Sequence, residues 1–340
     1  MPVMKYRSRS LAGLSRLIPE IVYVMCGARG ETGKLPIRGL PNVKYIGFEA
    51  DPAEWERLRR NARAGFQFEH AAVAGQTSRR TIHVTREPAC TSLLRPNAEV
   101  FARFLGGKQA AEVVREDAVQ TVALDELLPR LGVEKVDFLD LDTQGTELEI
   151  LQGAKELLSR SVSAIRTEVE FTALYEGQPL FGDVDRYLRD CGFVLFDLAR
   201  SRCRRQNLPI DQLTRGQLVW GEALYLRDYR WLSAKVATDA ALRLCLLAAH
   251  SGFHDYALEG MDLLLRGSVG PLSQAQESGL REARDQYVAD LRDSAGWLAV
   301  IHSFEAMGLG RPVKAAGRLA RQLGDRMLKD KEMTKYNWID

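Results

Sequence analysis

The chain has 340 residues, and its 47 lysines and arginines nearly balance its 45 aspartates and glutamates, for a formal net charge of +2. This balance gives no global reason to expect nucleic-acid binding, and no apolar run reaches the roughly 18–20 residues that a membrane span needs. Five scattered cysteines without a CxxC pair argue against a disulfide framework or a zinc site. They indicate buried thiols in a reducing compartment, so we expect a cytoplasmic protein.

We expect residues 1–20 to be a basic segment without the apolar stretch of a secretion signal. From residue 21 onward, short apolar runs that end in turn residues alternate with helical patterns. The predicted strands are residues 21–26, 43–48, 66–73, 80–85, 118–124, 136–141, 162–171, 193–198 and 217–226. The predicted helices are residues 51–62, 125–131, 146–158 and 184–191, the third of them opened by a capping box, Thr146-x-x-Glu149. This alternation predicts a doubly wound α/β domain with a mostly parallel sheet over residues 21–230.

After residue 233 the pattern changes to helices alone, which predicts a helical C-terminal domain over residues 231–340. Its predicted helices are residues 240–249, 255–265, 273–291, 297–307 and 313–328. The basic residues between Arg311 and Lys335 are typical of a solvated helix face, with contact to an anionic glycan, a lipid surface or a partner as the alternative. The helical domain is a candidate element for a homodimer.

A glycine-rich turn, Gly27-Ala28-Arg29-Gly30, follows the first predicted strand. Glycines at such a turn let the backbone approach a ligand closely. Glu49 ends the next strand 22 residues after Gly27, which matches the carboxylate that accepts hydrogen bonds from ribose hydroxyls in nucleotide-binding folds. The pair predicts a nucleoside-bearing cofactor without a 2′-phosphate, because Glu49 would repel that phosphate.

A cluster of carboxylates surrounds Gln144 where the strand at residues 136–141 ends: Asp140, Asp142 and Glu147. Ligands of open α/β sheets bind beyond such strand ends. The Asp-Leu-Asp run also resembles the metal-binding DxD of some glycosyltransferases, so a sugar-nucleotide site stays open.

The next strand carries two more carboxylates, Glu168 and Glu170, on one face. Adjacent carboxylates raise one another's pKa, which suits one of them to act as a general base near neutral pH.

The segment Val136-Asp-Phe-Leu-Asp-Leu-Asp-Thr-Gln-Gly-Thr-Glu-Leu-Glu-Ile-Leu-Gln-Gly-Ala154 resembles the signature of the FkbM-type S-adenosylmethionine-dependent methyltransferases. Residues 46–52, 90–97, 167–181 and 192–198 are similar to that family too. The resemblance spans about residues 21–228, and its specificity comes from the combination of segments rather than from any one of them.

The resemblance implies a class I methyltransferase (Rossmann-like) fold, with a seven-stranded sheet whose last strand is antiparallel, and S-adenosylmethionine as the cofactor. It implies methyl transfer to a hydroxyl of a sugar, a glycan or a glycosylated metabolite, with no metal. The implied cofactor-binding residues are Gly27, Ala28, Arg29, Gly30, Glu49, Ala50, Ala72, Asp140 and Gln144. The candidate catalytic residues are Asp142, as the first candidate for the base, and Glu168 and Glu170. Tyr175, Gln178 and Phe181, from a loop past a strand end, and Asn97, from another loop, are candidate acceptor-binding residues, with a packed surface loop as the alternative.

Two positions depart from the family pattern. Met25 stands where the family usually has an acidic residue that helps to hold the amino-acid part of the donor, and Asp140 stands where many members have lysine. A nucleotide-sugar-dependent glycosyltransferase, an NAD-dependent oxidoreductase, and a methyltransferase-like scaffold that acts through its helical tail are the alternative hypotheses.

Overall fold

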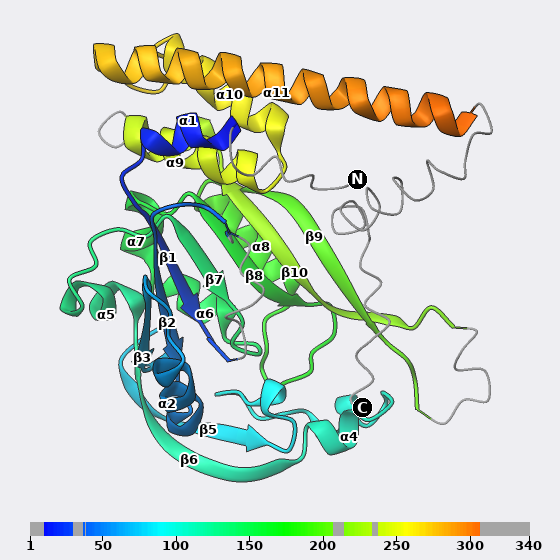
Figure 1. The fold of residues 1–340 in the computed structure, drawn as a ribbon. Coiled ribbons are helices and arrows are strands. Elements are labelled where there is room, and N and C mark those ends of the chain that lie inside the picture. The colour runs from blue at the N-terminus through cyan, green and yellow to red at the C-terminus, as the bar shows by residue number, and fades with distance from the viewer. Residues whose placement is uncertain (1–9, 30–36, 38, 207–213, 233–236, 307–340) are drawn as a thin grey trace. The chain divides into compact units, whose positions relative to one another are not determined.

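The computed structural model describes residues 10–29, 37, 39–206, 214–232 and 237–306 (Figure 1). They fall into two compact units. One combines the described residues of 21–35 and 43–231, and the other combines those of 1–20, 36–42 and 232–330. The second unit begins with a short helix that the sequence did not predict, α1 (Ser10–Arg16).

The first unit is built on a seven-stranded sheet in the order β3-β2-β1-β7-β8-β10-β9. Parallel pairing joins β3 to β2, β2 to β1, β1 to β7 and β7 to β8, whereas β10 runs antiparallel to both β8 and β9. The strands are β1 (Ile21–Cys26), β2 (Val43–Glu49), β3 (Phe66–His70), β7 (Phe138–Leu141), β8 (Ala164–Glu170), β9 (Phe193–Cys203) and β10 (Gln217–Arg227). This order confirms the predicted doubly wound sheet, and its direction of winding reverses between β1 and β7, where open α/β sheets bind ligands.

Amphipathic helices follow the strands along the chain, as predicted. An apolar core joins one face of the sheet, through residues such as Val24, Leu139 and Ile165, to helix residues such as Leu151 and Leu188. Each such side chain stabilises the fold by about 1.5–3 kcal/mol when it is fully buried. The helices of this unit are α2 (Pro52–Arg60), α3 (Ala98–Phe101), α4 (Gly107–Ala110), α5 (Leu124–Arg130), α6 (Glu147–Gln152), α7 (Lys155–Arg160) and α8 (Phe181–Asp190), with 3₁₀ turns at Pro88–Cys90 and Tyr229–Trp231.

The predicted strand at residues 66–73 is in fact two strands in two sheets. After β3 the backbone N–H of Ala71 donates to Glu49 at the end of β2, and the N–H of Ala74 donates to Val122. The chain therefore leaves the main sheet, and β4 (Ala72–Val73) pairs with β6 (Val113–Val122), which also pairs with β5 (Ser78–Thr85). These three strands form a separate sheet, in which β6 begins five residues earlier than the predicted strand at residue 118.

The predicted helix at residues 146–158 is also divided, and its predicted capping box is wrong. The side chain of Thr146 makes no capping hydrogen bond. The carboxylate of Glu147 instead accepts the N–H groups of Thr143 and Gly145, at 2.7 and 2.9 Å. A second helix, α7, begins here because the carboxylate of Asp125 accepts the N–H groups of its first turn.

The helical unit contains α9 (Ala237–His250), α10 (His254–Leu265) and α11 (Gln274–Ala306). The two helices predicted at residues 273–291 and 297–307 are one continuous helix up to Ala306, because the Gly296 between them costs only about 1 kcal/mol and no proline stops the helix. The predicted helix at 313–328 and the basic stretch from residue 311 lie outside the described residues. A homodimer through this unit stays a prediction. Over the residues that the structure describes, no helix has both the length and the apolar character to cross a membrane.

Candidate functional site

The turn after β1 lies directly against the turn after β7. Gly27 has a φ of 84°, and a Cβ atom there would lie 1.9 Å from the backbone oxygen of Asp142. The N–H of Asp142 donates to Cys26 O at 3.0 Å, and the N–H groups of Gly27 and Ala28 both donate to Phe48 O. Only glycine fits at position 27, and the two turns meet at the point where the sheet reverses its winding. Gly30, the other glycine predicted to bind the cofactor, lies outside the described residues.

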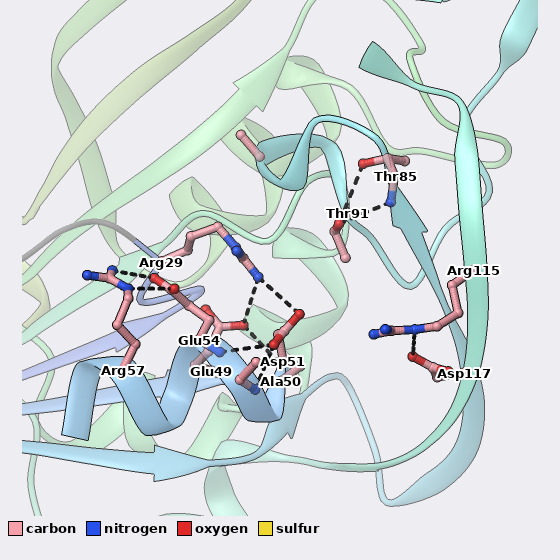
Figure 2. A network of polar contacts seen from close by, with 12 residues as sticks. Arg29, Glu49, Ala50, Asp51, Glu54, Arg57, Thr85, Thr91, Arg115 and Asp117 are labelled. Atoms are coloured by element: carbon pink, nitrogen blue, oxygen red, sulfur yellow. Dashed lines mark hydrogen bonds and ion pairs between the residues drawn. The ribbon is translucent and has the colours of Figure 1, made fainter. Parts of the chain in front are cut away.

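The end of β2 carries a small network of charged groups (Figure 2). Glu49 is buried, and its carboxylate accepts the N–H of Asp51 at 2.9 Å. The guanidinium of Arg29 lies 3.4 Å from the carboxylate of Asp51 and 4.0 Å from that of Glu49. Burial raises the pKa of Glu49, while the N–H of Asp51 and the charge of Arg29 oppose that rise. Of the predicted cofactor residues, Arg29, Glu49 and Ala50 therefore lie together, and buried Ala72 follows two residues after β3.

The end of β7 holds the predicted carboxylate cluster around one amide. Gln144 donates through Nε2 to Asp142 Oδ1 at 2.8 Å and to Glu168 Oε2 at 2.5 Å. Its Oε1 accepts the hydroxyl of Tyr175 at 3.1 Å. The structure thus brings together Asp142, Gln144 and Glu168 from β8, as expected from parallel neighbouring strand ends.

The electrostatics of this cluster favour proton exchange. Burial raises the pKa of Glu168 well above its ordinary value, and the neighbouring charges of Asp142, Glu170, Glu147 and Glu222 raise it further. Burial likewise raises the pKa of Glu170, and it raises that of Glu147 to about 7. The side chain of Asp142 is exposed, but the protein atoms packed around its carboxyl group also raise its pKa by desolvation. The hydrogen bond from Gln144 lowers that pKa in part. Carboxyl groups with raised pKa values are suited to general base catalysis near neutral pH.

Asp140 differs from the other carboxylates, because it already has strong partners. It is 1% exposed, and it accepts two hydrogen bonds from Arg166, at 2.8 and 2.5 Å, and a short one from the hydroxyl of Tyr23. Its register neighbour on β1, Met25, is completely buried, with the hydroxyl of Tyr45 3.2 Å from its sulfur. Asp140 is therefore one half of a buried ion pair, and its predicted contact with the cofactor stays a prediction.

The four residues predicted to bind the acceptor have different surroundings. Tyr175 and Gln178 are buried beside the cluster: Gln178 Oε1 accepts the N–H groups of Leu174 and Tyr175, and its Nε2 lies 2.8 Å from where a Cβ of Gly145 would be. Phe181 packs on the ring of Phe171 at the edge of the apolar core. The side chain of Asn97 caps α3 by accepting the N–H of Val100. The structure thus places Tyr175 and Gln178 next to Gln144 and Gly145. Phe181 and Asn97 are instead used in packing and in capping a helix.

Comparison with known proteins finds a family model that matches just under half of the chain. Residues 32–195 match the model of the methyltransferase FkbM domain. This segment of the chain is similar to the FkbM methyltransferase domain. The match begins after the Gly27 turn and includes Glu49, the carboxylate cluster and the Tyr175 segment.

The individual relatives are more distantly similar to this chain. The 2-O-methyltransferase NoeI of Sinorhizobium fredii is 38% identical over 61 residues, which are 18% of this chain and a quarter of that protein. Streptococcus pneumoniae Sp1610, a putative tRNA (m1A22) methyltransferase, aligns with 84% of this chain and 99% of its own at 13% identity and a TM-score of 0.33. Magnesium protoporphyrin IX methyltransferase from Synechocystis PCC 6803, solved with its donor bound, aligns with 64% of this chain and 74% of its own at 10% identity and a TM-score of 0.30. Because these TM-scores are low, the assignment of the fold rests on the strand order of the sheet and not on these two structures.

Sequence reasoning missed three residues that hold the site. Arg166 and Tyr23 bind Asp140, and Ser92 Oγ donates to the backbone oxygen of Gln144 at 2.8 Å. Arg166 had a usable signal, because an arginine in a strand of a buried sheet needs a partner for its charge. Tyr23 and Ser92 had none, since their partners are more than fifty residues away in the chain.

Glu49→Gln tests the cofactor side of the site. We expect S-adenosylmethionine to bind about ten- to a hundredfold more weakly to this variant, because hydrogen bonds to a charged group contribute about 1.5–3 kcal/mol. In the unmodified protein, binding should weaken as the pH falls through the raised pKa of Glu49, since a protonated carboxyl accepts hydrogen bonds from the ribose poorly. The variant should lose that pH dependence, as measured by calorimetry between pH 5 and pH 8.

A matched control is Glu54→Gln, which removes a salt bridge to Arg57 on the neighbouring α2 but leaves Glu49 in place. Equal affinities for Glu49→Gln and Glu54→Gln would exclude a ribose contact at Glu49.

Proposed function

We propose that this protein is an O-methyltransferase that moves the methyl group of S-adenosylmethionine to a hydroxyl of a sugar, a glycan or a glycosylated metabolite. The observation that carries the proposal is the contact between the two turns, because it joins the expected donor side at Gly27 to the carboxylate side at Asp142. The similarity to the FkbM domain supports methyl transfer, and the 2-O-methyltransferase among the relatives supports a hydroxyl acceptor.

The residues present fit the proposed cofactor. The backbone of Gly27 has no side chain to block a ligand, and the buried carboxylate of Glu49 suits the two hydroxyls of a ribose. Met25 is uncharged, so it has no charge to offer the amino group of the donor. When bound, S-adenosylmethionine supplies a methyl group on a positively charged sulfur.

The chemistry left to the protein is alignment and proton removal. The acceptor oxygen must lie in line with the methyl carbon and the sulfur, and its proton must leave as the new O–C bond forms. We assign the role of the base that accepts this proton to Asp142, with Glu168 as the second candidate and Glu170 as the third. Gln144 contacts the first two, and burial makes all three better proton acceptors near neutral pH.

The alternative functions have less support. A DxD metal site would need both aspartates, but Asp140 is held by Arg166 and Tyr23. Within the described part of the chain, no three His, Cys, Asp or Glu side chains are grouped to hold a metal ion. An NAD-dependent oxidoreductase has only the glycine-rich turn in its favour. A cytoplasmic location belongs to the proposal, and the five free cysteines are consistent with a reducing compartment.

Calorimetry with S-adenosylmethionine and S-adenosylhomocysteine tests the proposal first. We expect saturable binding of both with dissociation constants below about 1 mM, which corresponds to about −4.1 kcal/mol. NAD and nucleotide sugars are the controls, and tighter binding of either would favour the corresponding alternative. Absence of binding at millimolar donor would contradict methyl transfer and favour the scaffold hypothesis.

The acceptor can be identified by an experiment in cells. Glycans from the source organism should include a species heavier by one methyl group that disappears when the gene is deleted and returns with the unmodified gene. An unchanged glycan profile would exclude glycans as the acceptor class.

A further inference from the structure

Gln144 has an uncommon backbone conformation for its residue type. Its φ is 59°, in the left-handed region, which costs about 1–2 kcal/mol for a residue with a Cβ atom. Ser92 holds this conformation from a distant segment, because its hydroxyl donates to the backbone oxygen of Gln144 at 2.8 Å. A conformation of this kind persists only where the surroundings impose it.

The side chain of Gln144 has one chemically sensible orientation. Its oxygen accepts the hydroxyl of buried Tyr175, and its two amide hydrogens then serve two carboxylates, one on Asp142 and one on Glu168. The reversed amide would turn its oxygen toward both carboxylates. The two carboxylates therefore fix this orientation, and Gln144 Oε1 shares the single hydroxyl proton of Tyr175 with Cys90 O.

The charges around Glu168 make this amide necessary. Asp142 after β7, Glu170 from β8 itself, Glu147 from α6 and Glu222 from β10 are all near enough to raise the pKa of Glu168. Arg166, on the same strand, is already engaged elsewhere, because its guanidinium is bound to Asp140 and lies 3.9 Å from Glu222. A neutral donor that contacts two of these carboxylates holds them together against their repulsion.

We propose that Gln144 is a positioning residue that fixes Asp142 and Glu168 toward the acceptor, and that Tyr175 acts through it by binding its amide oxygen. This inference rests on the proposed methyl transfer and deepens it. It changes the role expected for Tyr175, because its hydroxyl is used inside the protein, on Gln144 and on Cys90 O, rather than on the acceptor.

Tyr175→Phe is the direct test, because it removes one oxygen and keeps the ring that packs edge-on against Phe101. We expect kcat to fall at least tenfold with donor affinity unchanged within about twofold. We also expect the acidic limb of the pH–rate profile to move to higher pH, because carboxylates that lose a hydrogen-bond donor bind protons more readily. Tyr187→Phe is the matched control: its hydroxyl donates to the backbone oxygen of Leu151, away from the cluster, so activity and limb should stay unchanged. Full activity of Tyr175→Phe with an unmoved limb would overturn the proposal.

Gln144→Gly separates positioning from folding. Glycine adopts the same φ without strain, so the variant should fold, yet it lacks the amide and should show the same loss of kcat. The titration of Glu168 gives a readout that needs no turnover, by carbon-13 NMR of labelled glutamate carboxyls with Glu168→Gln to identify the signal. We expect its midpoint to rise in both Gln144→Gly and Tyr175→Phe. A raised midpoint in a protein without methyltransferase activity would contradict the proposed function alone, and an active protein with an unmoved midpoint would contradict the positioning role alone.

Discussion

Asp142→Asn will abolish turnover while donor affinity stays within about threefold. Asparagine has nearly the same shape, and its side-chain oxygen can still accept the hydrogen bond from Gln144, but it cannot take a proton. Since general base catalysis typically contributes 10²- to 10⁴-fold, we expect kcat to fall by about that factor. Formation of S-adenosylhomocysteine measures turnover, and calorimetry measures donor binding.

The matched control for Asp142→Asn is Asp197→Asn, which changes an exposed aspartate of β9 that accepts the N–H of Leu198. It should leave turnover unchanged. If Asp142→Asn retained full turnover, Asp142 would not be the base, and the same measurement on Glu168→Gln would become decisive.

Gly27→Ala will weaken both the fold and the binding of the donor. The new Cβ would lie 1.9 Å from the backbone oxygen of Asp142, and the φ of 84° would be strained as well. Overpacking in a well-packed region typically costs about 1–3 kcal/mol, and a left-handed residue with a Cβ about 1–2 kcal/mol more. We expect a loss of several kcal/mol in the free energy of unfolding, measured in urea, and no detectable donor binding by calorimetry.

Gly132→Ala isolates the steric part of that effect. Gly132 has a φ of 69°, but a Cβ atom there would meet no other atom within 4 Å, so its substitution adds strain without a collision. The difference between the two variants measures the close approach of the two turns. Equal destabilisation of both would show that the Gly27 turn relaxes freely, contrary to the proposed rigid contact with Asp142.

The sequence was most informative where partners are close along the chain. Apolar runs predicted every strand of the main sheet, because central parallel strands such as β1 and β7 are buried on both faces. The cluster of Asp142 and Gln144 was predicted because both residues follow one strand directly. The antiparallel last strand was expected from the family resemblance and is confirmed by the pairing of β10.

The missed features depend on register and on competition between nearby groups. Arg166 meets Asp140 because their strands align these two positions, and single-strand patterns do not contain that alignment. Thr146 failed as a cap because its hydroxyl turns back and donates to the hydroxyl of Thr143. Such outcomes depend on distances that only the folded chain defines.

The buried pair of Asp140 and Arg166 constrains which type of residue fits at position 25. Met25 and Asp140 are register partners on neighbouring strands, and Tyr23, two residues before Met25 on the same face, reaches Asp140. A carboxylate at position 25 would place a second negative charge in this enclosed region, where Arg166 is already bound to the first. The methionine is thus compatible with Asp140 in a way that the usual acidic residue of the family is not.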